Sequence, residues 1–327
     1  MSRLGLTIPL ESTVLTRQRE HLDEIEAGGF TDLWSAEASG ADGFTPLVAA
    51  AVSHPSFRLG TAIVPAYTRS PALMAMSAAA LADVAEGEVV LGIGTSSDVI
   101  VAKWNGLSFR APYQRVRDVA TFVRRALSGE RVDMVCDSFS VNGFRLDRTP
   151  RRQPKIMIAA LRPGMLRLAG TVGDGAIVNW LSPVDVHQVV PYVLEANPQA
   201  DIVARLFVIP SRDLTAVRAT ARRAIAAYLN VPVYAEFHRW LGRGEQLEPM
   251  WRAWQAGDRA AALAAIPDKL IDELFLYGTP AQISTRIRDY VEAGVTTPIL
   301  AIMPPAGEAP SSTASIAEIG RAYTEGC

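Results

Sequence analysis

Eight short apolar segments alternate along this chain with longer segments of helical pattern. The predicted strands cover residues 4–8, 32–36, 58–64, 89–94, 155–159, 175–179, 202–209 and 298–303. The predicted helices cover residues 16–27, 44–54, 71–85, 113–127, 163–172, 183–195, 214–230 and 280–293. Strict alternation of strand and helix predicts a parallel sheet covered by helices, because parallel neighbours need a crossover between them.

The number of strand–helix units separates two parallel architectures. Near-continuous apolar runs such as 89–93 suit strands buried on both faces, which a closed barrel and a doubly wound open sheet share. The GxGxxG fingerprint of a dinucleotide-binding fold does not follow the first predicted strand. Eight units therefore favour an α/β fold of the closed (β/α)8 type, a TIM barrel.

Two segments, about 128–154 and 231–272, do not fit the repeat and are interpreted as insertions. The first contains Asn142-Gly143, a dipeptide typical of two-residue hairpin turns, with Phe139 and Val141 before it and Phe144 after it. The second carries three tryptophans and a mostly helical pattern, which predicts a small cap. No repeat or low-complexity linker marks a boundary, so we expect one domain over residues 1–327.

Composition argues against several classes of protein. Lys and Arg number 32 against 34 Asp and Glu, a net charge of -2, and no basic stripe points to nucleic acid. Cys136 and Cys327 cannot supply a disulfide framework, and the four histidines lack metal-ligand spacing, so we expect no metal. Without a leader pattern or 18 uninterrupted apolar residues, a cytoplasmic protein that acts on a small molecule, away from membranes, is expected.

In a barrel of this type, the strands' carboxyl ends and the loops after them build the site. Arg162-Pro163-Gly164 follows the fifth predicted strand and opens a helix, where free amides, the helix dipole and a guanidinium could bind a phosphate. The alternative is a proline-initiated helix whose arginine faces water. The loop from Gly94 through Thr95 and Ser96 could present hydroxyls and amides to a ring, or could be a tight turn.

Glu37 lies at the end of the second predicted strand beside an aromatic residue. Burial there could suit it to general acid or base work, whereas the alternative is a capping or salt-bridged glutamate. Trp34, Trp104 and Trp180 could wall an aromatic cofactor or could be packing residues. Few acid–base groups accompany the candidate phosphate-binding turn at 162–164, which we call the phosphate turn. This suits a cofactor that carries its own reactivity.

Taken together, the segments resemble the luciferase-like flavin and deazaflavin oxidoreductases, and within them the bacterial branch that uses coenzyme F420. The resemblance includes FTDLWSAE at 30–37, and it is co-linear over almost the whole chain. The matching stretches are 30–37, 40–47, 59–65, 68–71, 91–95, 160–165, 174–177, 277–280 and 293–295. The resemblance implies a (β/α)8 barrel with insertions, a homodimer, and a cofactor lying across the strand ends.

The family pattern also implies positions for the site. It places a non-prolyl cis peptide at Ala62-Ile63, against the cofactor's face. The implied cofactor-binding residues are Ala62, Ile63, Thr95, Ser96, Ala160, Leu161, Arg162, Pro163, Gly164 and Asn179. Glu37 is the candidate catalytic proton donor or acceptor, with Tyr67 and water as alternatives. Ala38 stands where relatives often carry a histidine, and Ser97 stands where sugar-phosphate dehydrogenases of the family carry a glutamate. Arg69, Arg110 and Arg115 are candidates to attract the cofactor's acidic tail or to be solvated surface residues.

The implied reaction is hydride transfer between the C5 of the deazaflavin and a small, hydrophobic organic substrate. An FMN-dependent monooxygenase of the same superfamily is an alternative, because flavin and deazaflavin share a stacking surface and a phosphate site. A flavin- or deazaflavin-binding protein without turnover is a second alternative, suggested by the missing histidine and glutamate.

Overall fold

The computed structural model describes residues 3–10 and 14–326, so Cys327 and the two ends of the predicted 1–327 domain lie outside the described residues. Its strands are β1 (Gly5–Thr7), β2 (Asp32–Ser35), β3 (Arg58–Thr61), β4 (Val64–Pro65), β5 (Val89–Gly94), β6 (Val132–Cys136), β7 (Phe139–Phe144), β8 (Lys155–Ala159), β9 (Gly175–Asn179), β10 (Asp201–Ile209), β11 (Phe275–Tyr277) and β12 (Thr297–Ile302).

The α-helices are α1 (Gln18–Ala27), α2 (Thr45–Ser53), α3 (Pro71–Val84), α4 (Pro112–Leu127), α5 (Pro163–Val172), α6 (Pro183–Leu194), α7 (Leu214–Leu229), α8 (Pro232–Trp240), α9 (Gly244–Gln255), α10 (Arg259–Ala264), α11 (Asp268–Leu274), α12 (Pro280–Glu292) and α13 (Thr313–Thr324). A 3-10 turn at Leu15–Arg17 precedes α1, and a π-helical turn at Val99–Trp104 precedes α4.

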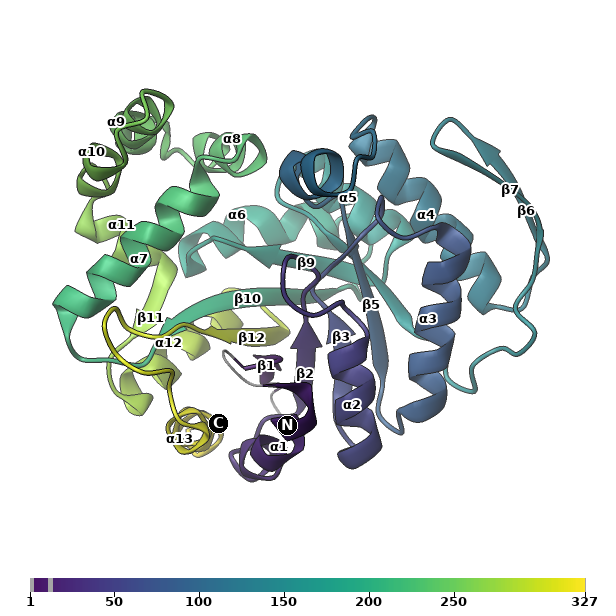
Figure 1. Cartoon of the computed structure of the whole chain (residues 1–327), viewed down its shortest axis with the longest axis horizontal. Coiled ribbons are helices and arrows are strands. Elements are labelled where there is room, and N and C mark those ends of the chain that lie inside the picture. Colours follow the sequence, from purple (N-terminus) through teal and green to yellow (C-terminus); the bar gives the residue numbers. More distant parts are fainter. Residues whose placement is uncertain (1–2, 11–13, 327) are drawn as a thin grey trace.

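The predicted barrel is confirmed. Going around it, the strands pair in parallel in the order β1, β2, β3, β5, β8, β9, β10 and β12. The circle closes because β12 pairs with β1, in register Gly5 with Ile299. All eight predicted strands are present, with helices around the outside (Figure 1).

The inside of the barrel is filled by side chains rather than left as a pore. Trp34, Val90, Met157, Ile177, Val203 and Ile299 form its buried central cluster. Trp34 occupies the space that two glycines leave free: a Cβ atom on Gly60 would lie 2.3 Å from the Trp34 ring. Trp34 is therefore a packing residue, the second of the two interpretations given above.

Three elements of the fold differ from the predicted ones. The third predicted strand, 58–64, is interrupted after Thr61 and resumes as β4, which pairs with β5. The short strand β11 extends the sheet at the carboxyl end of β10, beyond the part of β10 that pairs with β9. Helix α13 packs against α1 and α12, and so covers the seam where β12 meets β1.

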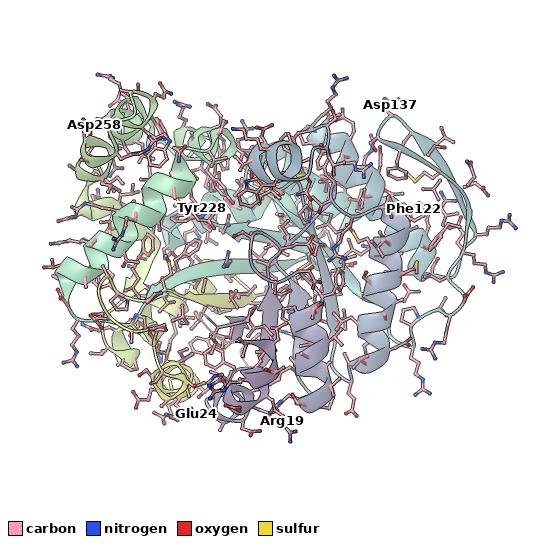
Figure 2. All side chains as sticks on the ribbon, in the orientation of Figure 1. Arg19, Glu24, Phe122, Asp137, Tyr228 and Asp258 are labelled. Carbon is pink, nitrogen blue, oxygen red and sulfur yellow. The ribbon has the colours of Figure 1, made fainter. Side chains whose placement is uncertain are left out.

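The first insertion contains the predicted hairpin, but the predicted position of its turn is wrong. Antiparallel pairing ends at Cys136 with Phe139, so the chain reverses at Asp137, which is labelled at the hairpin tip in Figure 2. Asn142-Gly143 lies inside β7, opposite a register shift in β6. Gly143 has φ 68°, so the left-handed conformation that this dipeptide favours serves a bulge.

The second insertion is helical, as predicted, and consists of α8, α9, α10 and α11. It shares an apolar cluster with α7 and with the barrel, in which Leu247, Met250 and Trp251 pack near Trp180 and Phe207. Figure 1 shows these helices at one end of the molecule and the β6–β7 hairpin at the other. Among the described residues, no helix is both long and apolar enough to cross a membrane.

Candidate active site at the barrel mouth

The predicted cofactor residues come together on four neighbouring strands of the barrel. Ala62 and Ile63 follow β3, Thr95 and Ser96 follow β5, 160–164 follow β8, and Asn179 ends β9. The strands are parallel, so their carboxyl ends form one rim, which we call the mouth. Ala62 and Asn179 are 117 residues apart in sequence, yet both lie on one arc of this mouth.

The Ala62-Ile63 peptide bond is cis, as predicted. The backbone on either side of it is held by the end of β2: the Ala62 N–H donates to the Ser35 carbonyl at 2.6 Å, and the Glu37 N–H donates to the Ile63 carbonyl at 3.1 Å. Both side chains pack against the cluster inside the barrel. The third strand thus carries an apolar kink at the mouth.

Small residues and two left-handed residues shape the floor beside this kink. A Cβ atom on Gly94 would lie 2.9 Å from both the Ala159 Cβ and the Ile63 side chain. Ser96 has φ 60° and Trp180 has φ 56°, conformations that cost energy for residues other than glycine. Both residues lie within two positions of the end of a barrel strand, a location where such backbone outliers point to function. Trp180 itself is buried and stacks 4.2 Å from Phe207, so it is a packing residue.

Helix α5 begins at the mouth with unpaired backbone donors. The residue before the helix, Arg162, has an extended backbone, and its side chain does not cap the helix. The first backbone hydrogen bond of the helix runs from the Leu166 N–H to the Arg162 carbonyl. The N–H groups of Gly164 and Met165 have no partner in the described part of the chain. A Cβ atom on Gly164 would meet nothing within 4 Å. The protein thus leaves open space at a dipole end that favours anions, which fits a phosphate.

Glu37 is one partner of a half-buried ion pair. The Arg69 guanidinium donates to it from Nη2 at 2.7 Å and from Nε at 3.0 Å, and the Gly43 N–H donates to the same carboxylate oxygen at 2.9 Å. Asp42 also accepts from Arg69, at 3.2 Å, while capping the start of α2. These contacts match the salt-bridged interpretation of Glu37, and they tie the loop after β2 to the loop after β4.

The other two candidate arginines differ from each other. Arg115 donates to the carbonyls of Ala66 at 2.9 Å and Ser138 at 2.6 Å, and its guanidinium lies over the Tyr67 ring. Burial lowers the pKa of Arg115, and its contacts connect the mouth with the hairpin. Arg110 is exposed, as is Arg162. In the described ranges, no three His, Cys, Asp or Glu side chains lie close enough together to hold a metal ion.

One polar residue of the mouth was missed at the sequence level. Arg205 is on β10, in register with Asn179 of β9 and Ile299 of β12. Its surroundings include Tyr234, whose hydroxyl lies 3.4 Å from the Asn179 side-chain nitrogen and whose pKa is raised by burial. The signal was available: Arg205 is the single charged residue in the apolar run 202–209, and it shares the inward parity of Val203.

Comparison with known protein families shows to which family the chain belongs. The sequence pattern of the luciferase-like monooxygenases matches residues 2–297. The chain belongs to this family. It is 27% identical over 286 residues to a 5,10-methylenetetrahydromethanopterin reductase of Archaeoglobus fulgidus, covering 83% of this chain and 85% of that protein. It is 25% identical over 299 residues to a Mycobacterium tuberculosis protein named for coenzyme F420-dependent oxidoreductase activity, covering 83% and 86%.

A solved structure shares the fold of this luciferase-like protein. The coenzyme F420-dependent tetrahydromethanopterin reductase of Methanopyrus kandleri superposes with a TM-score of 0.80 over 99% of both chains, at 22% sequence identity. At this level of identity the likeness concerns the barrel and its insertions. The residues that act at the mouth are argued from this chain's own geometry.

Proposed function

We propose that this protein is a coenzyme F420-dependent oxidoreductase that transfers a hydride to or from a small organic substrate. The observation that carries the proposal is the open, unpaired start of α5 at Gly164, on the same arc of the mouth as the kink at Ala62-Ile63. Family membership and the F420-dependent relative support it.

In this proposal, the residues of one arc hold the cofactor. The amides of Gly164 and Met165 bind its phosphate, with Ala160, Leu161 and Pro163 shaping the turn and Arg162 adding charge. Ala62 and Ile63 support the flat ring, and Thr95, Ser96 and Asn179 offer hydroxyl, amide and carboxamide groups along it. When bound, coenzyme F420 supplies or accepts a hydride at its C5. The protein fixes distance and orientation at the mouth, which is where most of its contribution lies.

Glu37 is the proposed catalytic residue. Its carboxylate is held by Arg69 and accepts hydrogen bonds there, so it suits the binding or removal of a proton rather than its donation. Half-buried between two loops, it is also fixed in orientation. A positioned acceptor at the mouth is what oxidation of a substrate hydroxyl would require.

An anaerobic titration with F420 and with FMN tests the proposal. We expect F420 to bind in the micromolar range and FMN not to bind. Gly164→Ala should weaken F420 binding by roughly 10-fold or more while leaving the melting temperature unchanged, because its Cβ atom enters space that only a ligand would fill. Gly244→Ala, at the start of α9, is the matched control, since its Cβ atom meets only ordinary contacts at 3.5 Å.

Tight binding of FMN without binding of F420 would instead favour a flavin monooxygenase, and binding of F420 without turnover of any substrate would favour a cofactor-binding protein. We further propose a cytoplasmic homodimer, in line with the low cysteine content and the family resemblance. Light scattering at several concentrations measures the mass; a monomer throughout would contradict the homodimer.

A further inference from the structure

Arg205 is half-buried, and it differs from the two buried arginines, Arg58 and Arg243, in having no partner. Arg58 pairs with Asp32, Glu88 and Asp201, and Arg243 pairs with Asp185 and Glu273. Among residues 3–10 and 14–326, no hydrogen bond or ion pair reaches the Arg205 guanidinium, and its Nε is fully buried without an acceptor. The fold therefore neutralises both of its buried guanidinium groups with carboxylates and leaves that of Arg205 unsatisfied.

The surroundings of Arg205 do not compensate for its charge. The guanidinium lies 5.5 Å from the centre of the Phe207 ring, and the nearest groups that stabilise the charged form are the hydroxyls of Tyr228 and Tyr234. Burial lowers the pKa of Arg205, although a guanidinium remains charged at neutral pH. A buried, unpaired charge is costly, so an anion that enters the mouth would relieve that cost.

A cavity lies beside Arg205, and a second unsatisfied polar group lines it. The cavity has a volume of about 380 Å³, and its walls include Thr7 of β1, Arg205 of β10 and Ala301 of β12. The Thr7 hydroxyl is buried and has no hydrogen-bond partner among the described residues. Thr7 and Arg205 therefore line one cavity of a size suited to a small organic molecule, while the Thr7 hydroxyl and the Arg205 Nε lie buried behind its surface.

The position of this cavity on the mouth separates it from the proposed cofactor arc. The cofactor residues follow β3, β5, β8 and β9, whereas the strand residues that line the cavity come from β10, β12 and β1, which are consecutive on the other side of the circle. The rest of its lining comes from the loops after β1 and β12 and from α1 and α13. In this closed circle of eight strands, β10 lies opposite β3, the strand that carries the kink at Ala62-Ile63. A molecule in the cavity would thus face the ring that the kink supports.

We propose that Arg205 binds the carboxylate of the substrate, so that the enzyme acts on a small carboxylic acid. The two terminal nitrogens of a guanidinium are parallel donors that match the two oxygens of a carboxylate, and those of Arg205 have no partner among the described residues. Ala301 and Ile302 supply apolar wall. This inference rests on the proposed function only in assigning the cavity to the substrate.

Calorimetric titration with benzoate and its neutral isostere benzamide, with and without F420, tests the inference. The full-length protein should bind benzoate at least roughly 10-fold more tightly than benzamide, and Arg205→Gln should remove this preference while F420 affinity stays unchanged. Arg223→Gln, an exposed arginine on α7, is the control and should retain the preference. Equal binding of benzoate and benzamide, or no binding of benzoate, overturns the proposal.

A second measurement needs no ligand. Because the unpaired charge destabilises the empty protein, Arg205→Met should raise its melting temperature by about 2 to 4 °C. A lower melting temperature would show that the guanidinium has a structural partner and would contradict the proposal. If Arg205→Gln weakens F420 binding instead of benzoate binding, Arg205 belongs to the cofactor site and the proposal fails, whereas the F420 assignment stands.

Discussion

At the scale of single residues, the Glu37–Arg69 pair joins two loops of the mouth that are 32 positions apart in sequence. The two side chains are 17% and 16% exposed, so each charge depends on the other for much of its stabilisation. Asp42 gives Arg69 a second acceptor, which limits the loss when Glu37 is changed.

We expect Glu37→Gln and Arg69→Gln each to lower the free energy of unfolding by about 1–3 kcal/mol, because each leaves a half-buried group without its partner. The double variant should lose less than the sum of the two, by about 1 kcal/mol. Urea denaturation of the four proteins measures this coupling. Strictly additive losses would show that the pair contributes nothing beyond its separate members.

His238 gives the folded protein a dependence on pH. Burial, with Arg243 nearby, lowers its pKa to about 3, and this outweighs the opposing effects of Asp185 and of a hydrogen bond with the Trp180 backbone. In the unfolded chain His238 binds a proton near pH 6.5, whereas in the folded protein it does so only at about pH 3. Protonation between these values therefore favours the unfolded chain, so the folded protein is most stable above pH 6.5 and loses stability as the pH falls.

When the pH is lowered from about 7.5 to 5, His238 should lower the free energy of unfolding of the wild type by about 2 kcal/mol. His238→Gln, which does not titrate, should show a correspondingly shallower loss over the same range, whatever its stability at pH 7.5. Urea denaturation at both pH values measures the difference. Parallel pH profiles for the two proteins would mean that His238 titrates normally in the folded state.

At the scale of elements, the β6–β7 hairpin depends on the bulge at Gly143. The left-handed φ of 68° there excludes most side chains, and the Gly143 N–H donates to the Asp133 carboxylate at 2.6 Å. The hairpin then packs Phe139 and Phe144 on Phe122 of α4, with ring centres 5.9 Å and 5.7 Å away.

Gly143→Ala should therefore destabilise the hairpin by about 1 kcal/mol, and Gly143→Asn by less, because asparagine tolerates the left-handed region. Amide hydrogen exchange of residues 132–144 measures the local effect. Equal exchange in both variants and in the wild type would contradict the role of this glycine.

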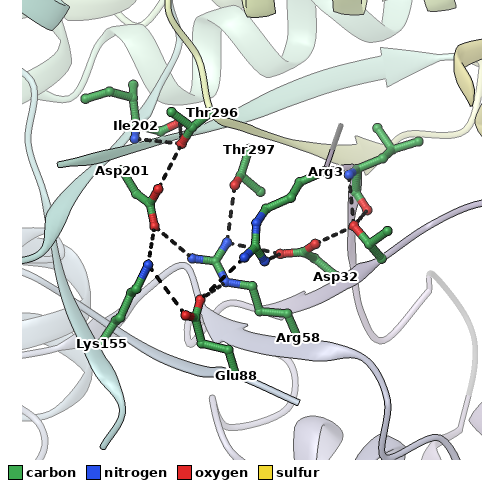
Figure 3. A network of polar contacts seen from close by, with 11 residues as sticks. Arg3, Asp32, Arg58, Glu88, Lys155, Asp201, Ile202, Thr296 and Thr297 are labelled. Carbon is green, nitrogen blue, oxygen red and sulfur yellow. Dashed lines mark hydrogen bonds and ion pairs between the residues drawn. The ribbon is translucent and has the colours of Figure 1, made fainter. Parts of the chain in front are cut away.

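At the scale of the whole molecule, the two ends of the barrel have different tasks. The end opposite the mouth is closed by the network in Figure 3, where the Arg58 guanidinium reaches Asp32 at 3.1 Å, Glu88 at 2.6 Å and Asp201 at 3.2 Å. Lys155 adds a contact to Asp201 at 2.9 Å. These residues come from the beginnings of β2, β3, β8 and β10, so the network ties distant strands together.

Arg58→Gln should lower the free energy of unfolding by about 3–5 kcal/mol, because it leaves the buried Asp32 without its main counter-charge. F420 affinity should be unchanged below the melting temperature, since the network lies at the end of the barrel away from the site. Arg252→Gln, from an exposed pair with Glu248, is the control and should have no measurable effect. A large loss of F420 binding in Arg58→Gln would show that the two ends are coupled.

The barrel was predictable because its signals are local. Apolar runs, helix-starting prolines and the alternation of the two appear within windows of about ten residues, and they indicated all eight strands of the barrel. The candidate phosphate turn at 162–164 was indicated by its residues, and the cis bond at Ala62-Ile63 followed from the family resemblance; in the structure, that turn and that bond lie at one mouth. What those residues bind remains a prediction.

The amino-acid sequence by itself determined the order and type of these elements, and hence which residues reach the mouth. Only the tertiary structure decided which charges are paired there. Glu37 meets Arg69, Arg58 meets three carboxylates, and Arg205 meets none, although all are charged residues at strands or strand ends. The reason is physical: an ion pair depends on distances between residues far apart in the chain, and these distances exist only once the barrel has closed.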